Sequence, residues 1–337
     1  MSESIIITKC LEDSAKYSDA VIVLAAIREI LIKNPSVGKF FGIERTITTL
    51  TNEKITPDLI ATYDDERNCI FFELKWAVSQ RTIKDELLDL KRYFSVNCKL
   101  NVSSTVLEHN DVILICHVED TKIVVNSIKE LTSSPDNDFL KPDNLAVWSW
   151  AFIKKKKTSK DFSDEMRLNC EYGKTKNNEL EKFVNEPGGI PVPADVLQYL
   201  RSKFLFVVQK PPIQYTMKVL LMHVFPSYSS NLPKGTAVDL QIDAIYNNMK
   251  SLFPGWRNID SETIQAKKQW IMEALYTFKK IGFDITSLPH PIRKSYDEWI
   301  CGKLEKFSRK ERRYAFRTRG IRKVNGKGYS KIDKYFS

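Results

Sequence analysis

The sequence predicts an α/β fold for the first half of the chain and a mainly helical fold for the second half. In the first half, apolar and polar residues alternate along residues 69–76 as they do in strands, and segments of helical and strand character follow one another over residues 17–172. Beyond residue 195 the spacing of apolar residues becomes helical. A chain of 337 residues is long enough for two domains of ordinary size.

The expected core begins with a largely apolar helix over 21–32, for which Ser18 offers an N-cap and Pro35 a stop. Thr82, followed by Asp85, indicates the start of a second helix. The full expected order is helix 21–32, strands 43–50, 58–63 and 69–76, helix 82–96, strand 111–117, helix 125–131 and strand 145–153. This order predicts a mixed sheet flanked by helices.

The expected domain boundary is a linker over 174–195, because residues 186–193 (Glu-Pro-Gly-Gly-Ile-Pro-Val-Pro) are rich in residues that break regular structure. The helical spacing that follows predicts helices over 194–207, 213–225, 237–253 and 261–281. A short extended segment at 283–286 would allow a winged-helix or related helix-turn-helix domain, although any small helical bundle has the same periodicity. The predicted parts are 1–173, the linker 174–195, a helical domain over 196–302 and an extension over 303–337.

Two acidic residues and a lysine are placed by the strand pattern at neighbouring positions. Glu73 and Lys75 share one face of the strand 69–76 and stand about 6–7 Å apart, because a strand rises about 3.3 Å per residue. Asp58 lies near the start of the preceding strand, and the polar residues 64–68 suit a turn between antiparallel strands. Two carboxylates and an amine so placed could hold a divalent cation and activate water against a phosphodiester.

The pattern Pro57-Asp58, fourteen residues, then Glu73-x-Lys75 resembles the PD-(D/E)xK nuclease superfamily over residues 17–172. The resemblance implies a restriction-endonuclease-like αβββαβ core. It also implies that Asp58 and Glu73 bind Mg²⁺, for which Mn²⁺ would substitute, and that Lys75 assists the attacking water. The expected activity is a Mg²⁺-dependent endonuclease acting on DNA, in a restriction or defence, transposition or junction-resolution setting.

The motif is short, so its surroundings matter. The chain has two other acid-x-Lys tripeptides, Asp89-Leu-Lys91 and Asp120-Thr-Lys122, but neither follows a Pro-Asp pair one strand upstream. The alternative interpretation makes Asp58 and Glu73 part of an exposed, ion-pairing face of a half-buried sheet.

The resemblance also suggests a third acidic metal ligand from the first helix, which here would be Glu29. An exposed Glu29 paired with Lys33 explains the same residue, and Glu44 is the rival for the ligand role. Three polar or basic residues after the motif, Gln80, Lys84 and Lys91, lie together with Tyr93 where such nucleases touch substrate. A solvated helix face explains them equally well.

The positive charge is concentrated in the last 35 residues. Residues 303–337 hold thirteen lysines or arginines and three acids, whereas residues 1–302 balance at 39 of each. Tyr314 and Phe316 lie among the arginines, so the segment suits phosphates and unpaired bases, although a nonspecific polyanion-binding tail is the alternative. The expected nucleic-acid contacts in this segment are Arg309, Lys310, Arg312, Arg313, Arg317, Arg319, Arg322 and Lys323.

The remaining expectations concern partners and location. The layout of a nuclease core followed by a helical domain is similar to that of TnsA-type transposon endonucleases, which implies DNA as partner, RNA being less favoured, and allows a homodimer or an activating subunit. Six scattered cysteines without a CxxC pair, the lack of a basic secretory leader and the lack of a membrane-length apolar run predict a cytoplasmic protein. The alternative from another class is a non-catalytic nucleic-acid-binding protein on a nuclease-derived scaffold.

Overall fold

The protein is seen here as a computed structural model. It describes residues 3–48, 53–64, 66–94, 109–156, 162–187, 189–192, 210–225, 227, 241–253, 256–257, 259 and 261–280. The chain divides into two compact units, residues 20–208 and residues 1–19 together with 209–337. The long helix α1 (Glu3–Lys33) contributes its first part to the second of these units and its remainder to the first.

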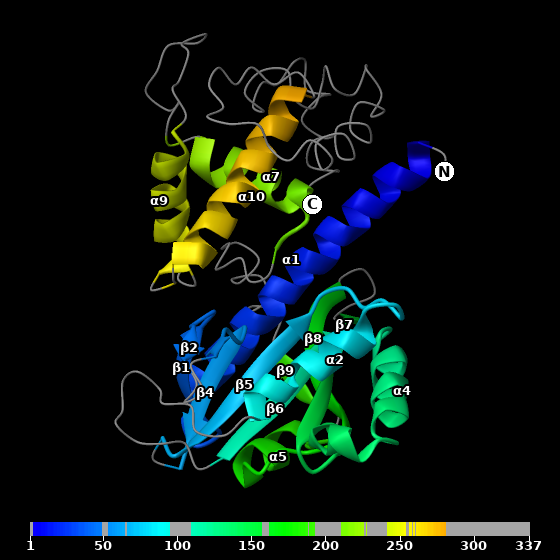
Figure 1. The fold of residues 1–337 in the computed structure, drawn as a ribbon. Coiled ribbons are helices and arrows are strands. Elements are labelled where there is room, and N and C mark those ends of the chain that lie inside the picture. The colour runs from blue at the N-terminus through cyan, green and yellow to red at the C-terminus, as the bar shows by residue number, and fades with distance from the viewer. Residues whose placement is uncertain are drawn as a thin grey trace. The chain divides into compact units, whose positions relative to one another are not determined.

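The unit 20–208 is a mixed α/β structure around a curled seven-stranded sheet (Figure 1). The strand order is β1 (Lys39–Ile43), β4 (Leu59–Tyr63), β5 (Asn68–Lys75), β6 (His109–His117), β7 (Leu145–Lys156), β8 (Phe162–Tyr172) and β9 (Ile190–Val192). The central strands β5, β6 and β7 run parallel, and every other neighbouring pair is antiparallel. The predicted α/β class with a mixed sheet is therefore confirmed.

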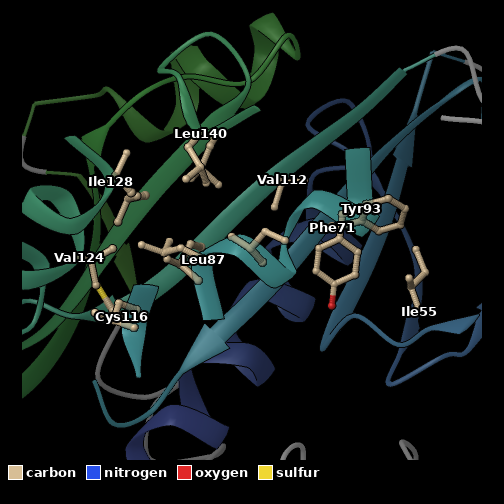
Figure 2. Packing of buried hydrophobic residues seen from close by; sticks show 14 of the residues in the cluster. Ile55, Phe71, Leu87, Tyr93, Val112, Cys116, Val124, Ile128 and Leu140 are labelled. Atoms are coloured by element: carbon tan, nitrogen blue, oxygen red, sulfur yellow. The ribbon is translucent and has the colours of Figure 1, made fainter. Parts of the chain in front are cut away.

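One face of this sheet packs against short helices, and Figure 2 shows the apolar cluster between them. Phe71, Val112 and Cys116 from the strands meet Leu87 and Ile128 from the helices, and all five are buried. The helices that contribute to the cluster are α2 (Ile83–Asp89), α3 (Lys91–Phe94), α4 (Thr121–Leu131) and the 3₁₀ segment Pro135–Leu140. This cluster supports the part of β5 that carries the candidate site.

The opposite face of the sheet meets the C-terminal part of α1. Residues 20–27 of the helix are buried, and Leu31 converges with Ala61 of β4 and Ile70 of β5 at Gly38. A side chain at Gly38 would lie 3.2 Å from Leu31, so a glycine allows the helix and the sheet to approach closely there. Apolar residues of β5 therefore have apolar partners on both faces of the sheet.

Several predicted bounds were wrong, and each error has a local cause. The first helix starts at Glu3 rather than after Ser18, because the sequence before Ser18 continues the helix and needs no cap there. The expected strand 43–50 is instead the end of β1 followed by β2 (Ile47–Thr48), which pairs with β3 (Lys54–Ile55) as a separate ribbon. The expected helix 82–96 is divided into α2 and α3 at Leu90.

The segment 174–195, expected to be a linker, contains regular structure. Helix α5 (Asn178–Val184) is capped by the Asn177 side chain, which accepts a hydrogen bond from the Leu180 amide, and β9 pairs with β8. The proline at position 191 is compatible with β9 because that strand is at the edge of the sheet. Neither β8, α5 nor β9 was expected from the sequence.

The described part of residues 210–280 is helical, as predicted for this half. It comprises α7 (Ile213–Val219), a π-helical turn η2 (Leu220–Val224), α9 (Ile242–Leu252) and α10 (Ser261–Lys280). The expected helix 194–207, the extended segment 283–286 and the basic residues 303–337 lie outside the described residues. None of the helices in the described part combines the length and apolar character needed to cross a bilayer.

Candidate catalytic site

The strand register brings Asp58 and Glu73 opposite one another. Leu59 of β4 pairs with Phe72 of β5, so the preceding Asp58 faces the following Glu73 across the antiparallel ladder. Asp58 Oδ2 accepts a hydrogen bond of 2.7 Å from the backbone N–H of Leu74. The proximity of Asp58 and Glu73, which the strand pattern predicted, therefore follows from the pairing of β4 with β5.

A third carboxylate residue lies at the same end of the next strand. Ile43 of β1 pairs with Leu59, and the amide of Glu44 donates a 3.1 Å hydrogen bond to the Asp58 carbonyl. Glu44 is buried, and its φ of 45° is in the left-handed region that a residue with a side chain rarely adopts. A strained, buried acid beside two others points to a functional demand at this position.

Electrostatics at Asp58 follow from this grouping. Burial raises the pKa of Asp58 well above its usual value, and the charges of Glu73 and Glu44 raise it further. The Leu74 N–H and the Lys75 ammonium act in the opposite direction but do not cancel the effect. Asp58 is only 4% exposed and Glu73 7%, so the alternative of an exposed ion-pairing face does not describe them. A site with this electrostatic character favours a bound cation.

Lys75 is held between two carboxylates from different elements. Its Nζ lies 3.4 Å from Glu73 Oε1 and 3.2 Å from Oε2 of Glu86 on α2. Burial lowers the pKa of Lys75, but the charges of Glu73, Glu86 and Asp58 outweigh it and raise the pKa above its usual value. The side chain therefore presents a protonated ammonium to the site.

The other carboxylate oxygen of Glu73, Oε2, is held by a hydrogen bond from a buried tyrosine. The Tyr93 hydroxyl donates a 3.0 Å hydrogen bond to Glu73 Oε2, and the ring packs against Phe71 with centroids 5.6 Å apart. Asn110 Nδ2 in turn donates to the Tyr93 carbonyl at 3.1 Å. Tyr93 is 1% exposed, so it orients Glu73 from the core rather than meeting substrate.

The two rival acids are now distinguished by position. Glu29 on α1 pairs with the neighbouring Arg28 at 2.9 Å, and its side chain is 27% exposed. Its recorded contacts among the described residues include none with Asp58 or Glu73. Glu44, by contrast, acts on the charge of Asp58 directly.

The predicted substrate contacts are only partly placed. Gln80, Lys84 and Lys91 are all exposed, in a turn, on α2 and on α3 respectively. Lys84 pairs with Glu130 of α4 at 2.6 Å, so its charge is directed toward α4. The eight basic residues expected to contact nucleic acid in the C-terminal extension lie outside the described residues.

The donor set fits a hard cation that substrate helps to bind. In the part of the chain that the structure describes, no three His, Cys, Asp or Glu side chains are gathered so that they could hold a metal ion by themselves. Mg²⁺, however, is commonly bound through one or two carboxylates, with waters and phosphate oxygens completing the shell. Asp58 and Glu73 provide such a pair, and oxygen ligands of this kind also suit Mn²⁺.

Glu86 was missed by the sequence analysis. It is a half-buried acid on α2, three residues after the buried Ile83, and so lies toward the apolar side of the helix. An acid on the inward side of an amphipathic helix is a signal that the sequence does contain. Its partner Lys75 could be identified only once α2 was placed against β5.

Comparison of the chain with models of known protein families, with curated proteins and with solved structures gave no significant match.

Proposed function

We propose that this protein is a metal-dependent nuclease, with a core of the PD-(D/E)xK type, that hydrolyses phosphodiester bonds in DNA. The observation that supports this most is the pairing of buried Asp58 with Glu73 at one end of β4 and β5, beside the Lys75 ammonium. Two carboxylates and a cation at one sheet end match the residue types that metal-assisted phosphoryl transfer requires.

In this proposal each residue of the site has a separate task. Asp58 and Glu73 would hold Mg²⁺ or Mn²⁺, and Glu44 adds negative charge that favours the cation. When bound, the ion would lower the pKa of a coordinated water and screen the phosphate charge. Lys75, held protonated beside Glu73, would stabilise the negative charge that develops on the phosphate. The Leu74 amide fixes the orientation of Asp58.

The helical unit and the basic extension complete the proposal. The described helices α7, α9 and α10 are consistent with a winged-helix or other helix-turn-helix DNA-binding domain. Residues 303–337 supply the positive charge for the DNA backbone. A homodimer or an activating subunit would supply a second centre for cleavage of both strands.

The test is cleavage of supercoiled plasmid by the full chain in Mg²⁺, Mn²⁺ or EDTA. The wild type is compared with Asp58→Ala, Lys75→Ala and a control, Asp143→Ala, whose exposed carboxylate pairs with Lys174 far from the motif in sequence. We expect metal-dependent nicking or linearisation in the wild type and the control, and none in the two site variants. Salt-dependent DNA binding without cleavage and without Mn²⁺ binding would instead support the non-catalytic nucleic-acid-binding alternative.

A further inference from the structure

A short two-stranded β-ribbon connects Glu44 and Asp58 of the candidate site along the chain. The chain leaves β1 at Glu44, forms β2 and β3, and returns to β4 through Asp58. The hydrogen bond from the Glu44 amide to the Asp58 carbonyl closes the base of this excursion. Glu44 and Asp58 of the candidate site therefore lie at the two ends of the ribbon, whose described residues are 45–48 and 53–56.

The ribbon is anchored on one face by a pair of isoleucines. Ile47 and Ile55 are directly paired in the ladder, are 2% and 1% exposed, and both belong to the core cluster that includes Phe71 and Tyr93. Figure 2 shows Ile55 at the edge of that cluster, on the side of Tyr93. Burial of the two isoleucine side chains holds this face of the ribbon against the core. The ribbon thus has a fixed inner face and a defined outer face.

The outer face carries hydrogen-bond donors. The hydroxyls of Thr46 and Thr56 lie 3.1 Å apart on facing strands, and Thr56 and Lys54 are exposed. The ionisable residues in the described part of the ribbon are Arg45, Glu53 and Lys54. The Arg45 guanidinium lies 4.4 Å over the Phe41 ring, which fixes its direction at the foot of the ribbon.

A substrate with a phosphodiester backbone needs such donors beside this site. Glu44, Asp58 and Glu73 would repel a polyanion, and a metal ion offsets that repulsion only at the scissile phosphate. Threonine hydroxyls, lysine and arginine are side chains that commonly contact phosphates and sugars. The outer face of the ribbon presents these groups next to the carboxylates.

We propose that the ribbon, through its described residues 45–48 and 53–56, is a nucleic-acid contact surface that holds the phosphodiester backbone flanking the scissile bond. This inference rests on the proposed function and adds to it the surface that positions the substrate. Contacts to the backbone carry little sequence information, so the ribbon would set affinity and register rather than a recognition sequence. The same chemistry is present in duplex and single-stranded DNA.

The test measures binding of fluorescein-labelled duplex and single-stranded oligonucleotides to the full chain in EDTA by fluorescence anisotropy, over a range of salt concentrations. Lys54→Ala should weaken binding about 3- to 10-fold and reduce the slope of log Kd against log salt by about 1. Thr46→Ala/Thr56→Ala should weaken binding with little change in that slope. The control is Lys182→Ala, an exposed lysine on α5 paired with Glu179, for which we expect wild-type affinity and slope.

The outcomes separate this inference from the proposed function. Wild-type cleavage together with unchanged affinity and salt slope in both ribbon variants would overturn the ribbon and leave the nuclease standing. Weakened binding in the ribbon variants, with no cleavage by the wild type, would support the ribbon as a contact surface and overturn catalysis. If the wild type binds neither oligonucleotide, the ribbon proposal fails, and the proposed function fails with it if no plasmid is cleaved in Mg²⁺ or Mn²⁺. Circular dichroism and thermal unfolding of each variant establish that it is folded.

Discussion

The two ends of strands β4 to β6 each hold a buried aspartate, but the surroundings of the two carboxylates differ. At one end, Asp111 of β6 is 1% exposed and is surrounded by donors. It accepts hydrogen bonds from the Tyr63 hydroxyl at 2.6 Å and the Lys176 amide at 2.9 Å, and its other contact is His109 Nε2 at 3.0 Å. These bonds tie the sheet to the segment that precedes α5.

At the other end, Asp58 has two acidic neighbours. Burial raises its pKa most, and the charges of Glu73 and Glu44 raise it further. Because Asp58 and Asp111 are both buried, burial alone does not distinguish a structural carboxylate from a candidate functional one. What distinguishes them is the balance between hydrogen-bond donors and like charge, because an arrangement that opposes ionisation is costly to stability and is retained where a cation or a reaction needs it.

The largest expected effect is on the rate of cleavage. Asp58→Asn should lower the initial rate of metal-dependent plasmid nicking at least about 10²-fold, because one of the two carboxylates proposed to bind the metal loses its charge. Asp111→Asn, the matched change at the opposite end, should retain a rate within a few-fold of wild type at temperatures where it is folded. Equal losses in the two variants, both shown to be folded by circular dichroism, would contradict the assignment of the site to the Asp58 end.

The same two substitutions should change stability in opposite directions. A carboxylate whose folded-state pKa is raised contributes stability that is present below its ordinary value of 3.8 and is lost as the pH rises through the raised pKa. Asparagine does not ionise, so the Asp58→Asn variant does not lose this stability as the pH rises. Its Tm should therefore exceed the wild-type Tm at pH 7, and the difference between the two Tm values should shrink near pH 4. Asp111→Asn should lower the free energy of unfolding by about 1–3 kcal/mol, because it weakens bonds to buried donors.

Scanning calorimetry in EDTA at the two pH values gives both comparisons. Addition of Mn²⁺ should then raise the wild-type Tm and leave that of Asp58→Asn nearly unchanged, because only a protein that binds the ion in its folded state gains stability from it. An Asp58→Asn variant less stable than wild type at pH 7 would show that the acidic grouping is not a source of strain.

The sequence could place Asp58, Glu73 and Lys75 together because they lie on two adjacent strands. A period-2 alternation fixes which residues share a face, and a short polar turn fixes that the two strands are antiparallel neighbours. The sequence could not choose between Glu44 and Glu29 as the third acid near Asp58. That choice depends on the left-handed turn at Glu44 and on the position of α1. Such information arises only when elements distant in sequence pack together.

The same limit applied to the fold. The central strand β5 was predictable from its period-2 alternation, which is typical of strands. The edge strand β9 has three residues, one of them a proline, and a breaker-rich segment of this kind reads as a linker until its pairing with β8 is known. Helix α1 was predicted too short because its apolar residues outnumber its polar ones only from Ala20 onward.

A smaller effect is expected from deleting one hydroxyl at each end. Tyr93→Phe leaves Glu73 Oε2 without its 3.0 Å donor, so the Mn²⁺ concentration for half-maximal cleavage should rise about tenfold, as for the loss of a group that orients a metal ligand. Tyr63→Phe removes the matching bond to Asp111 and should lower stability by about 1 kcal/mol without changing the Mn²⁺ requirement. A Mn²⁺ requirement that rises equally in both variants would indicate a general loss of folded protein.

The smallest expected effect concerns the third acid. Glu44→Gln should weaken Mn²⁺ binding by a few-fold to about tenfold in titration calorimetry. The substitution removes one negative charge close to Asp58, and the attraction of that charge for the ion is partly screened by the surroundings. Glu29→Gln should bind Mn²⁺ as the wild type does, since its carboxylate is paired with Arg28. The reverse result would place Glu29 at the metal. Glutamine keeps the size of the side chain in both variants, so a difference between them reports the position of the charge rather than a change in packing.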